Sequence, residues 1–406
     1  MCSSDLEEFK SKTLGFVYHV PFWEENGEIW TCYSPIGRYV EALANHFNQV
    51  TLITPIRKQD QLPLYRVNAA NLKIITVKPL GNVQSYYFHI FHFYASCFKA
   101  MKNIDILNIR MPTLTGFPAF LAARFRGKPV FLVIVGENLE FIKLAGYSGI
   151  KKLAAHVVGL LQDLLMRRMV RKSPTFTNGE DLFNKFRGLN KDVYLMRSST
   201  INQADILPAF RDTCQKAPYR ILTVAVVTPR KGTSLIPETI AQLRDSGIQV
   251  TWKYIGNIEG NSGEMELKKT KKLAEDLNVH HYLTFECPRG FDKLLPIYRE
   301  SDIFVLPTYL EGVPRVILEA QASGLPVITT SVGGIPKAVR TGYDAILIPP
   351  GNPSKIAEEI RKIIRDHKYR QKLIENGLNT AHGFTLESET QRMLNKINEI
   401  NNHILV

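Results

Sequence analysis

The 406-residue sequence is poor in cysteine, and its cysteines form no pattern that would hold a metal or build a disulfide framework. The five are Cys2, Cys32, Cys97, Cys214 and Cys287, without a Cys-x-x-Cys pair or a histidine at ligand spacing. Scattered single cysteines are typical of reduced thiols in a cytosolic protein. The sequence therefore predicts neither a zinc site nor disulfide bonds.

Long apolar runs are missing as well. No window reaches the roughly 18 to 20 uninterrupted apolar residues that a membrane-spanning helix needs. The first residues, MCSSDLEEFKSK, are acidic and then basic, and no apolar core of a signal peptide follows them. We expect a cytoplasmic protein, with peripheral attachment at the inner face of the membrane as a further option.

The sequence also lacks a dinucleotide-binding fingerprint. No Gly-x-Gly-x-x-Gly opens a helix anywhere in the chain. That motif brings the backbone of a first helix close to a pyrophosphate in NAD-dependent enzymes. Its absence argues against a Rossmann-type dehydrogenase.

Acidic residues are scarce in the first half of the chain. Residues 1–200 carry 25 Lys and Arg against 15 Asp and Glu, whereas the rest carries 26 against 23, within a net charge of +13. A basic half attracts phospholipid, nucleic acid or a phosphorylated substrate, or it is only a solvated basic surface. Nucleic acid is the weakest of these partners because no nucleic-acid-binding motif accompanies the charge.

Two segments of this basic half could touch an anionic membrane surface. Residues 85–102 are dense in aromatic side chains, and residues 151–172 form a long apolar stretch with basic ends. The flanking cations are Lys151, Lys152, Arg167, Arg168, Arg171 and Lys172. Basic amphipathic helices can lie in such an interface. For both segments we favour the alternative, a core-facing helix with basic ends.

Short apolar runs alternate with segments of helical period along the whole chain, which is typical of βαβ units and parallel sheets. Strands are expected at 14–20, 49–56, 105–110, 128–135, 219–227, 249–256, 281–287, 302–308, 326–330 and 345–350. Helices are expected at 36–47 and at 115–127, where Gly127 suits a C-terminal cap.

This alternation of expected strands and helices occurs in both halves of the chain, with a polar break near residues 198–217. We therefore predict an α/β protein with two Rossmann-like parallel-sheet domains, 1–200 and 218–384, that face each other across a cleft. Residues 385–406 are expected to form a C-terminal helix that returns toward the N-terminal domain. Ligands of such sheets bind outside the carboxyl ends of the strands.

The stretch YLEGVPRVILEAQASGLPVITTSVGG places two carboxylates around a turn. Glu311, Gly312 and Val313 follow an expected strand and so lie in a loop at its carboxyl end. Pro314 suits the first turn of a helix because it has no N–H to leave unpaired, and Glu319 falls on the second turn. Backbone N–H groups of the loop suit a phosphate. The two glutamates are thus placed to hold two ends of one ligand, with solvated surface glutamates as the alternative.

This Glu-x7-Glu spacing resembles the signature of retaining glycosyltransferases of the GT-B fold, family four (glycosyl transferases group 1). The blocks that carry the resemblance, in the family's order and spacing, are YRILTVAVVTPRKGTSLIPETIAQL, WKYIGN, FECPRGFDKLLPIYRESDIFVLPTYLEG and LEAQASGLPVITTSVGGIPKAV. They cover most of the second half. A single Glu-x7-Glu would be weak support, whereas four blocks in sequence are strong support.

The resemblance implies a function. Such an enzyme moves a hexose-type sugar from a nucleotide diphosphate sugar, UDP or GDP, to a saccharide or lipid-linked acceptor. The process would be surface polysaccharide or glycolipid assembly. The family generally needs no bound metal or other cofactor, and the sequence contains no Asp-x-Asp motif that would suggest one.

The resemblance also implies roles for residues. Glu311 would contact hydroxyls of the donor sugar, Lys231 the diphosphate and Glu319 the ribose. The catalytic candidates are Glu311, Lys231, Arg230 and Glu137. The donor-binding candidates are Glu319, Gly312, Val313, Pro314, Arg289, Pro288 and Gly256. The acceptor-side candidates are His19, Gly37, Arg110 and Asn138, of which His19 and Arg110 lie at the ends of expected strands.

Some positions depart from the family pattern. Val226 stands where the family has an arginine, so a cation for the diphosphate is missing unless Arg230 supplies it. A histidine of the family is replaced by Gly136, and Glu137 or Asn138 would then take over its contact with the donor sugar.

Two alternatives to a transferase remain. Another enzyme of the same fold, such as a nucleotide-sugar epimerase or a phosphorylase-like enzyme, would share these blocks. A non-catalytic member would bind the nucleotide sugar without turning it over, and Val226 motivates that reading.

Overall fold

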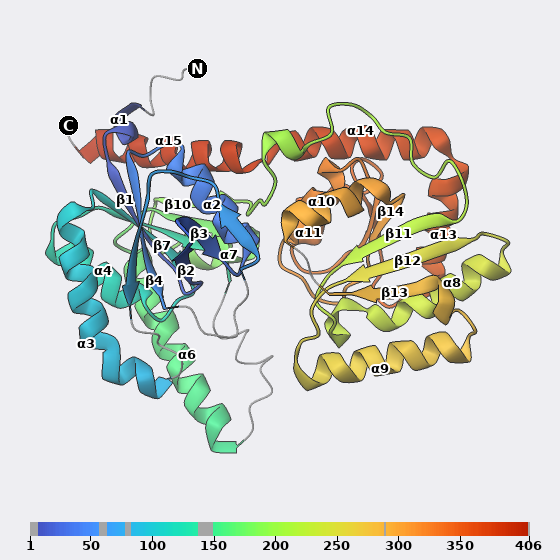
Figure 1. The fold of residues 1–406 in the computed structure, drawn as a ribbon, viewed down its shortest axis with the longest axis horizontal. Coiled ribbons are helices and arrows are strands. Elements are labelled where there is room, and N and C mark those ends of the chain that lie inside the picture. The colour runs from blue at the N-terminus through green and yellow to red at the C-terminus, as the bar shows by residue number, and fades with distance from the viewer. Residues whose placement is uncertain (1–6, 57–62, 78–82, 137–148, 288–289, 405–406) are drawn as a thin grey trace. The chain divides into compact units, whose positions relative to one another are not determined.

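The computed structural model describes residues 7–56, 63–77, 83–136, 149–287 and 290–404, without the side chains of 83–90, 150–152 and 401–404. The chain divides into two compact units (Figure 1). Unit 1 comprises Met1–Ser198 with Glu389–Val406, and unit 2 comprises Ser199–Ser388. Each unit contains one parallel sheet with helices packed on it, so the predicted α/β class is confirmed.

The large sheet of unit 1 has the order β10-β9-β8-β7-β1-β4-β6, and all neighbouring strands are parallel. Its strands are β1 (Thr13–Val17), β4 (Gln49–Pro55), β6 (Leu72–Val77), β7 (Ile106–Met111), β8 (Val130–Ile134), β9 (Thr175–Asn178) and β10 (Val193–Met196). The strand order reverses between β1 and β7. In open parallel sheets the carboxyl ends of two such strands form a ligand crevice.

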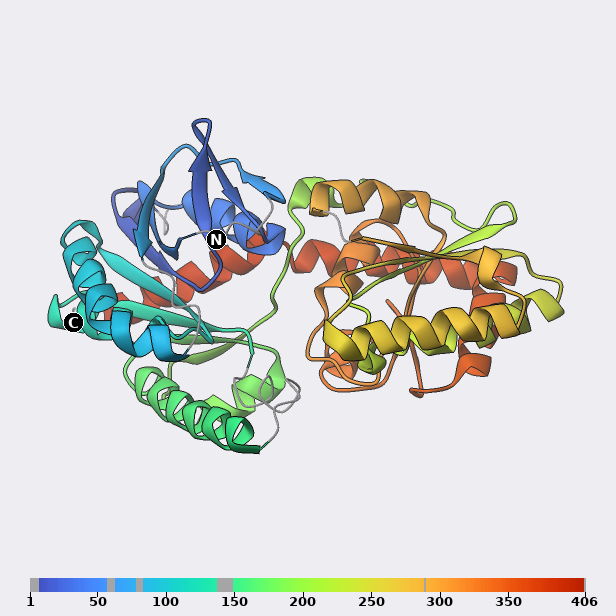
Figure 2. The ribbon, with the colours of Figure 1, turned by 60° about the horizontal axis from the view of Figure 1, so that its bottom comes forward.

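Helices α3 (Val83–Ala100), α4 (Gly116–Phe125), α6 (Gly149–Val170) and α7 (Glu180–Phe186) contribute to one hydrophobic core with this sheet. In both views of Figures 1 and 2, α3, α4 and α6 lie on the same side of the sheet. Gly127, directly after the cap residue of α4, has a positive φ of 63°, as predicted for a helix end.

Elsewhere in unit 1 lie α1 (Glu7–Lys10), α2 (Ser34–Ala44) and the part of α15 (Leu386–Ile404) from Glu389 onward. Tyr39 of α2 packs against Phe16 of β1, and its hydroxyl lies 3.7 Å from the sulfur of Met393 on α15. The C-terminal part of α15 is therefore part of the packing of unit 1.

A small antiparallel sheet of β2 (Phe22–Glu25), β3 (Glu28–Thr31) and β5 (Tyr65–Val67) was not predicted. Its strands are three or four residues long and partly charged, so they lack an apolar run. The signal that could have found them is the Asn26-Gly27 turn, where both residues have positive φ, as in a tight hairpin. A Cβ on Gly37 of α2 would lie 2.4 Å from the ring of Tyr65, so this glycine allows β5 to pack on α2.

The sheet of unit 2 has the order β13-β12-β11-β14-β15-β16 and is also parallel. Its strands are β11 (Tyr219–Val224), β12 (Val250–Ile255), β13 (Leu283–Glu286), β14 (Ile303–Leu306), β15 (Val327–Thr330) and β16 (Ile346–Ile348). Several end two or three residues earlier than expected, because the chain leaves the ladder there to form loops. The order reverses between β11 and β14, and in open parallel sheets ligands bind outside the carboxyl ends of such a pair.

Two helix layers cover the sheet of unit 2. Helices α8 (Ile236–Asp245), α9 (Gly260–Asp276) and α13 (Pro353–Arg365) share one core cluster, while α10 (Phe291–Glu300), α11 (Arg315–Ala322) and α12 (Ile335–Ala338) belong to another. Helix α14 (His367–Gly383) packs on α11. The 3-10 turns are η2 (Met101–Asn103), η3 (Gln203–Asp205), η4 (Pro229–Lys231), η5 (Thr233–Leu235) and η6 (His280–Tyr282).

No helix in the described part of the chain combines the length and the apolar character that crossing a membrane requires.

Candidate active site

The loops that follow β11 and β14 are tied together at the point where the strand order of unit 2 reverses. The backbone N–H of Tyr309 donates to the carbonyl of Arg230 at 2.7 Å, and the Thr308 hydroxyl donates to the same carbonyl at 3.0 Å. Gly232 has a φ of +67°, and a Cβ there would lie 2.0 Å from the Pro307 carbonyl oxygen. Only glycine fits this backbone approach, so the turn that carries Lys231 is fixed on the end of β14.

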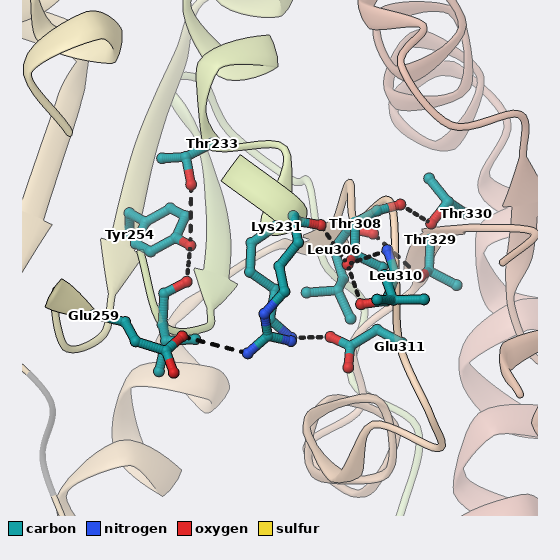
Figure 3. A network of polar contacts seen from close by, with 12 residues as sticks. Lys231, Thr233, Tyr254, Glu259, Leu306, Thr308, Leu310, Glu311, Thr329 and Thr330 are labelled. Atoms are coloured by element: carbon teal, nitrogen blue, oxygen red, sulfur yellow. Dashed lines mark hydrogen bonds and ion pairs between the residues drawn. The ribbon is translucent and has the colours of Figure 1, made fainter. Parts of the chain in front are cut away.

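Lys231 and Glu311 form an ion pair, although they lie 80 residues apart in the sequence. Figure 3 shows the two side chains pointing toward each other. Both are largely buried, with side-chain exposures of 10% and 11%. Burial lowers the pKa of Lys231, while the Glu311 carboxylate acts in the opposite direction. The structure thus brings the two leading catalytic candidates together.

Arg230 has a different environment from its neighbour Lys231. It is about one-third exposed and pairs with Glu259 at 3.5 Å, a pair that solvent screens. Val226, at the position where an arginine was expected, uses its carbonyl to accept a hydrogen bond from the Tyr254 hydroxyl at 3.1 Å. Val226 thus supplies no cation at this position. Arg230 is the neighbour of Lys231 in the sequence, and its contact with a diphosphate stays a prediction.

The loop that contains Glu311 leaves space beside it. A Cβ on Gly312 would meet no atom within 4 Å, whereas one on Gly333 would lie 1.8 Å from the Glu311 carbonyl oxygen. A Cβ on Gly256, at the end of β12, would lie 1.7 Å from the Ala225 carbonyl oxygen. Gly333 and Gly256 therefore allow close backbone packing around the site, whereas Gly312 borders open space.

Glu319 lies on α11 and is buried, with 6% exposure. The Tyr298 hydroxyl donates to its Oε2 at 2.9 Å, and the Thr200 hydroxyl donates to its Oε1. Burial and the Glu319 charge together raise the pKa of Tyr298 well above its usual value. Two fixed donors orient the carboxylate, and each carboxylate oxygen keeps a further lone pair for a ligand hydroxyl.

Tyr298 and Thr200 are positioning residues that the sequence did not reveal. Tyr298 comes from α10, and Thr200 comes from the polar segment after β10. Tyr298 lies inside the family block FECPRGFDKLLPIYRESDIFVLPTYLEG and Thr200 in the polar break near residues 198–217, but neither was among the predicted site residues.

The remaining donor-side candidates have mixed outcomes. Pro314 precedes α11 as its N-cap residue with extended backbone, φ −76° and ψ 122°, so the prediction that it lies in the first helical turn is wrong by one position. Val313 lies beside it in the loop, half-buried. Pro288 and Arg289 lie outside the described residues, as do Glu137 and Asn138.

On the acceptor side, two candidates lie at the reversal point of the unit 1 sheet. His19 follows β1, and Arg110 lies in the neighbouring β7. Arg110 is buried, with 6% exposure, and its guanidinium carbon lies 4.6 Å from the centre of the Tyr39 ring and 5.8 Å from that of Tyr18. The His19 ring lies 4.1 Å from the Tyr18 ring. Burial raises the pKa of Tyr39 to about 12, so its phenol stays neutral beside the cation.

Two Rossmann-like units with polar and charged residues at the reversal points of their sheets define a protein of the GT-B type. Solved structures support this class. Sucrose-phosphate synthase from Thermosynechococcus elongatus aligns with a TM-score of 0.69 at 16% identity, over 97% of this chain and 100% of its own. HepE from Anabaena, solved with UDP and glucose, aligns with a TM-score of 0.67 at 13% identity, over 96% and 100%. The fold is therefore that of GT-B proteins.

The family assignment rests on the second half of the chain. Residues 210–380 match the model of the family glycosyl transferases group 1, which confirms the predicted resemblance for this part of the chain. D-inositol 3-phosphate glycosyltransferase from Streptomyces bingchenggensis is 33% identical over 159 residues, which are 38% of this chain and 34% of that relative. The match thus spans about a third of the relative's length.

Proposed function

We propose that this protein is a retaining glycosyltransferase that moves a hexose-type sugar from a nucleotide diphosphate sugar, UDP or GDP, to a hydroxyl group of a saccharide or lipid-linked acceptor. The observation that carries the proposal is the pairing of Lys231 with Glu311 beside Gly312, at the reversal point of the sheet. A cation, a carboxylate and open space meet there, as a sugar diphosphate requires.

Each group has a role in this reaction. Lys231 neutralises charge on the diphosphate as the sugar–phosphate bond breaks, an interaction that strengthens toward the transition state. The diphosphate draws Lys231 away from Glu311, whose carboxylate then accepts hydrogen bonds from hydroxyls of the sugar. Glu319 accepts from the ribose hydroxyls. HepE, whose fold is similar, was solved with UDP and glucose, which supports a donor of this kind.

Retention follows from attack on the face that the leaving group vacates. The bond between the anomeric carbon and the diphosphate oxygen breaks, and the acceptor oxygen bonds to that carbon from the same side. The acceptor proton passes to the departing phosphate oxygen. This route needs no bound metal, in accord with the missing Asp-x-Asp motif.

A thermal-shift panel with UDP, GDP, ADP and their sugars tests the donor. We expect one base to raise the melting temperature, because a ligand that binds only the folded state stabilises it.

NMR of products, with and without acceptor sugars, then tests the reaction. Epimerised donor in the absence of acceptor would contradict a transferase, and binding without turnover would indicate a non-catalytic member.

The acceptor of this reaction is proposed to carry an anionic group that Arg110 binds. Its Nη1 is buried without a hydrogen-bond partner among the described residues, and its Nη2 donates to the Ser198 hydroxyl at 3.4 Å. No carboxylate of the described residues forms an ion pair with it. A guanidinium with an unused donor suits a phosphate. The Streptomyces relative is named for an acceptor that is itself phosphorylated, D-inositol 3-phosphate.

Arg110→Met should therefore remove the preference for a phosphorylated acceptor. With D-inositol 3-phosphate and unphosphorylated inositol as test acceptors, we expect kcat/KM for the phosphorylated one to fall by about 10- to 100-fold, the value of a lost charged hydrogen bond. The unphosphorylated acceptor should change little. Arg110→Lys, which keeps the charge, serves as the control. An equal loss for both acceptors would show that Arg110 only supports the fold.

The protein is also proposed to bind an anionic membrane surface through α6. Leu153, Val157, Leu160, Leu161 and Leu164 are each between 47% and 67% exposed, so the predicted core-facing position of this helix is wrong for these residues. They recur at spacings of three, four and seven, which places them on one face. The exposed cations Arg168, Arg171 and Lys172 follow at the C-terminal end of the helix. An apolar face with basic residues at its end matches the interface of an anionic bilayer.

Replacing Leu153, Leu160 and Leu164 by glutamine should abolish co-sedimentation with vesicles that contain anionic lipid. Because the three side chains are exposed, the melting temperature should stay within a few degrees of the wild-type value. Binding of the wild-type protein should fall steeply between low and physiological salt, since the electrostatic part is screened. The exposed Leu195, also a leucine of unit 1, provides the control variant Leu195→Gln. Salt-independent binding, or binding that survives the triple change, would contradict the proposal.

A further inference from the structure

A polar pocket of about 350 Å³ lies at the opposite end of the unit 2 sheet from the candidate active site. It is lined by Arg211, Asp212, Gln215, Lys216, Ala217, Arg220 and Asp302. Arg220 is the second residue of β11, and Asp302 directly precedes β14. These are the strands whose carboxyl ends lead to Lys231 and Glu311. Six residues of β11 separate the two ends by about 20 Å.

Both carboxylates of the pocket are already neutralised. Asp302 accepts from the Arg220 guanidinium through both oxygens, at 3.1 and 3.2 Å, and from the Arg220 backbone N–H at 2.8 Å. Asp212 pairs with Arg370 at 2.9 Å. Each acid thus already has a cationic partner of its own.

Two further cations line the same space. Among the residues that the structure describes, neither Arg211 nor Lys216 has a carboxylate within ion-pair distance. Arg211 donates from Nη2 to the carbonyl of Ser301 at 2.8 Å, but its Nε is buried without a partner in the described part of the chain. Burial lowers the pKa of Arg211, and the Arg220 charge acts in the same direction against that of Asp302. An anion in the pocket would offset both the burial of the Arg211 charge and its repulsion by Arg220.

We infer that this pocket binds the phosphoryl group of a small phosphate monoester, through Arg211 and Lys216. A guanidinium and an ammonium together match a dianionic phosphoryl group. The volume lies at the lower end of the range for small-molecule sites and exceeds what inorganic phosphate would fill. The ligand therefore has a polar body, which Gln215 and the neutralised acids contact. This second site is separate from the donor site and does not depend on the proposed transferase activity.

Calorimetric titration with glycerol 3-phosphate at constant ionic strength tests the inference. The titration uses the Lys231→Ala variant as background, so that binding at the candidate active site is weakened. Lys216→Gln and Arg211→Gln should each lower the affinity by about 10- to 100-fold, as expected for a lost charged hydrogen bond. Lys268→Gln removes an exposed charge of α9 in the same unit and should change nothing.

Each outcome decides the matter. Absent binding, binding that both pocket variants retain, or equal binding of glycerol would overturn the inference. Lys216 is exposed, so Lys216→Gln remains decisive even if Arg211→Gln fails to fold. Vesicles that contain phosphatidic acid separate a lipid headgroup from a soluble monoester. If the protein binds these vesicles but not glycerol 3-phosphate, and Lys216→Gln weakens the vesicle binding, the inference of a soluble ligand is overturned.

Discussion

Lys231→Ala is expected to lower the turnover number for sugar transfer by about 100- to 1,000-fold, the usual cost of removing one preorganised group that stabilises charge in the transition state. The charge in question develops on the diphosphate as the glycosidic bond breaks. Lys231 is held for this task by its turn, which Gly232 fixes on the end of β14. Because the side chain is largely buried, its charge acts in a less polar medium than water and is worth more there.

Steady-state kinetics with saturating acceptor separates this effect from binding. A loss in kcat with a smaller change in KM shows that the interaction strengthens toward the transition state. Lys231→Arg keeps the charge and should recover part of the rate, while Lys268→Ala on α9 controls for a lost surface lysine. Removing Lys231 also leaves Glu311 without its partner, so the melting temperature must be measured in parallel. Wild-type kcat in a folded Lys231→Ala protein would place the site elsewhere.

The proximity of Lys231 and Glu311 could be predicted from the sequence because it follows from strand order. Each residue comes shortly after a buried strand, and the family blocks place those strands next to each other at the reversal point. The closeness of two side chains 80 residues apart therefore needed only local patterns and one rule about parallel sheets.

Other features depended on tertiary packing and could not be predicted in this way. The Thr200 hydroxyl reaches Glu319 only because the segment after β10 packs against α11. The exposed leucines of α6 have the composition of a core helix, and only the arrangement of its neighbours decides which face remains in contact with water. Burial is a property of the assembled unit, whereas periodicity belongs to the segment alone.

At Val226, where the family pattern has an arginine, the loop keeps its conformation without the arginine side chain. The backbone carbonyl of Val226 accepts a hydrogen bond from Tyr254, whose phenol also receives one from the Thr233 hydroxyl at 3.3 Å. This part of the loop is therefore ordered through backbone contacts that any side chain permits. The departure removes a charge without removing the loop geometry, and we therefore propose Lys231 as the main cation on which turnover depends.

Glu319→Ala is expected to weaken binding of the nucleotide by about 1 to 3 kcal/mol, which is roughly 5- to 150-fold in Kd. The carboxylate is proposed to accept hydrogen bonds from both ribose hydroxyls, and Thr200 and Tyr298 hold it in place for that contact. Turnover at saturating donor should change less than the Kd, since the ribose is remote from the bond that breaks.

A nucleotide without ribose hydroxyls makes this prediction specific. If Glu319 contacts the ribose, the variant should lose affinity for the ribonucleotide but bind the 2′,3′-dideoxynucleotide as the wild-type protein does. The energies of the two changes would then be strongly non-additive, as for groups in direct contact. Tyr298→Phe is the matched control, because it removes one hydroxyl that orients the carboxylate and keeps the charge. An equal loss for both nucleotides would mean that Glu319 supports the packing of α10 and α11 and does not touch the ribose.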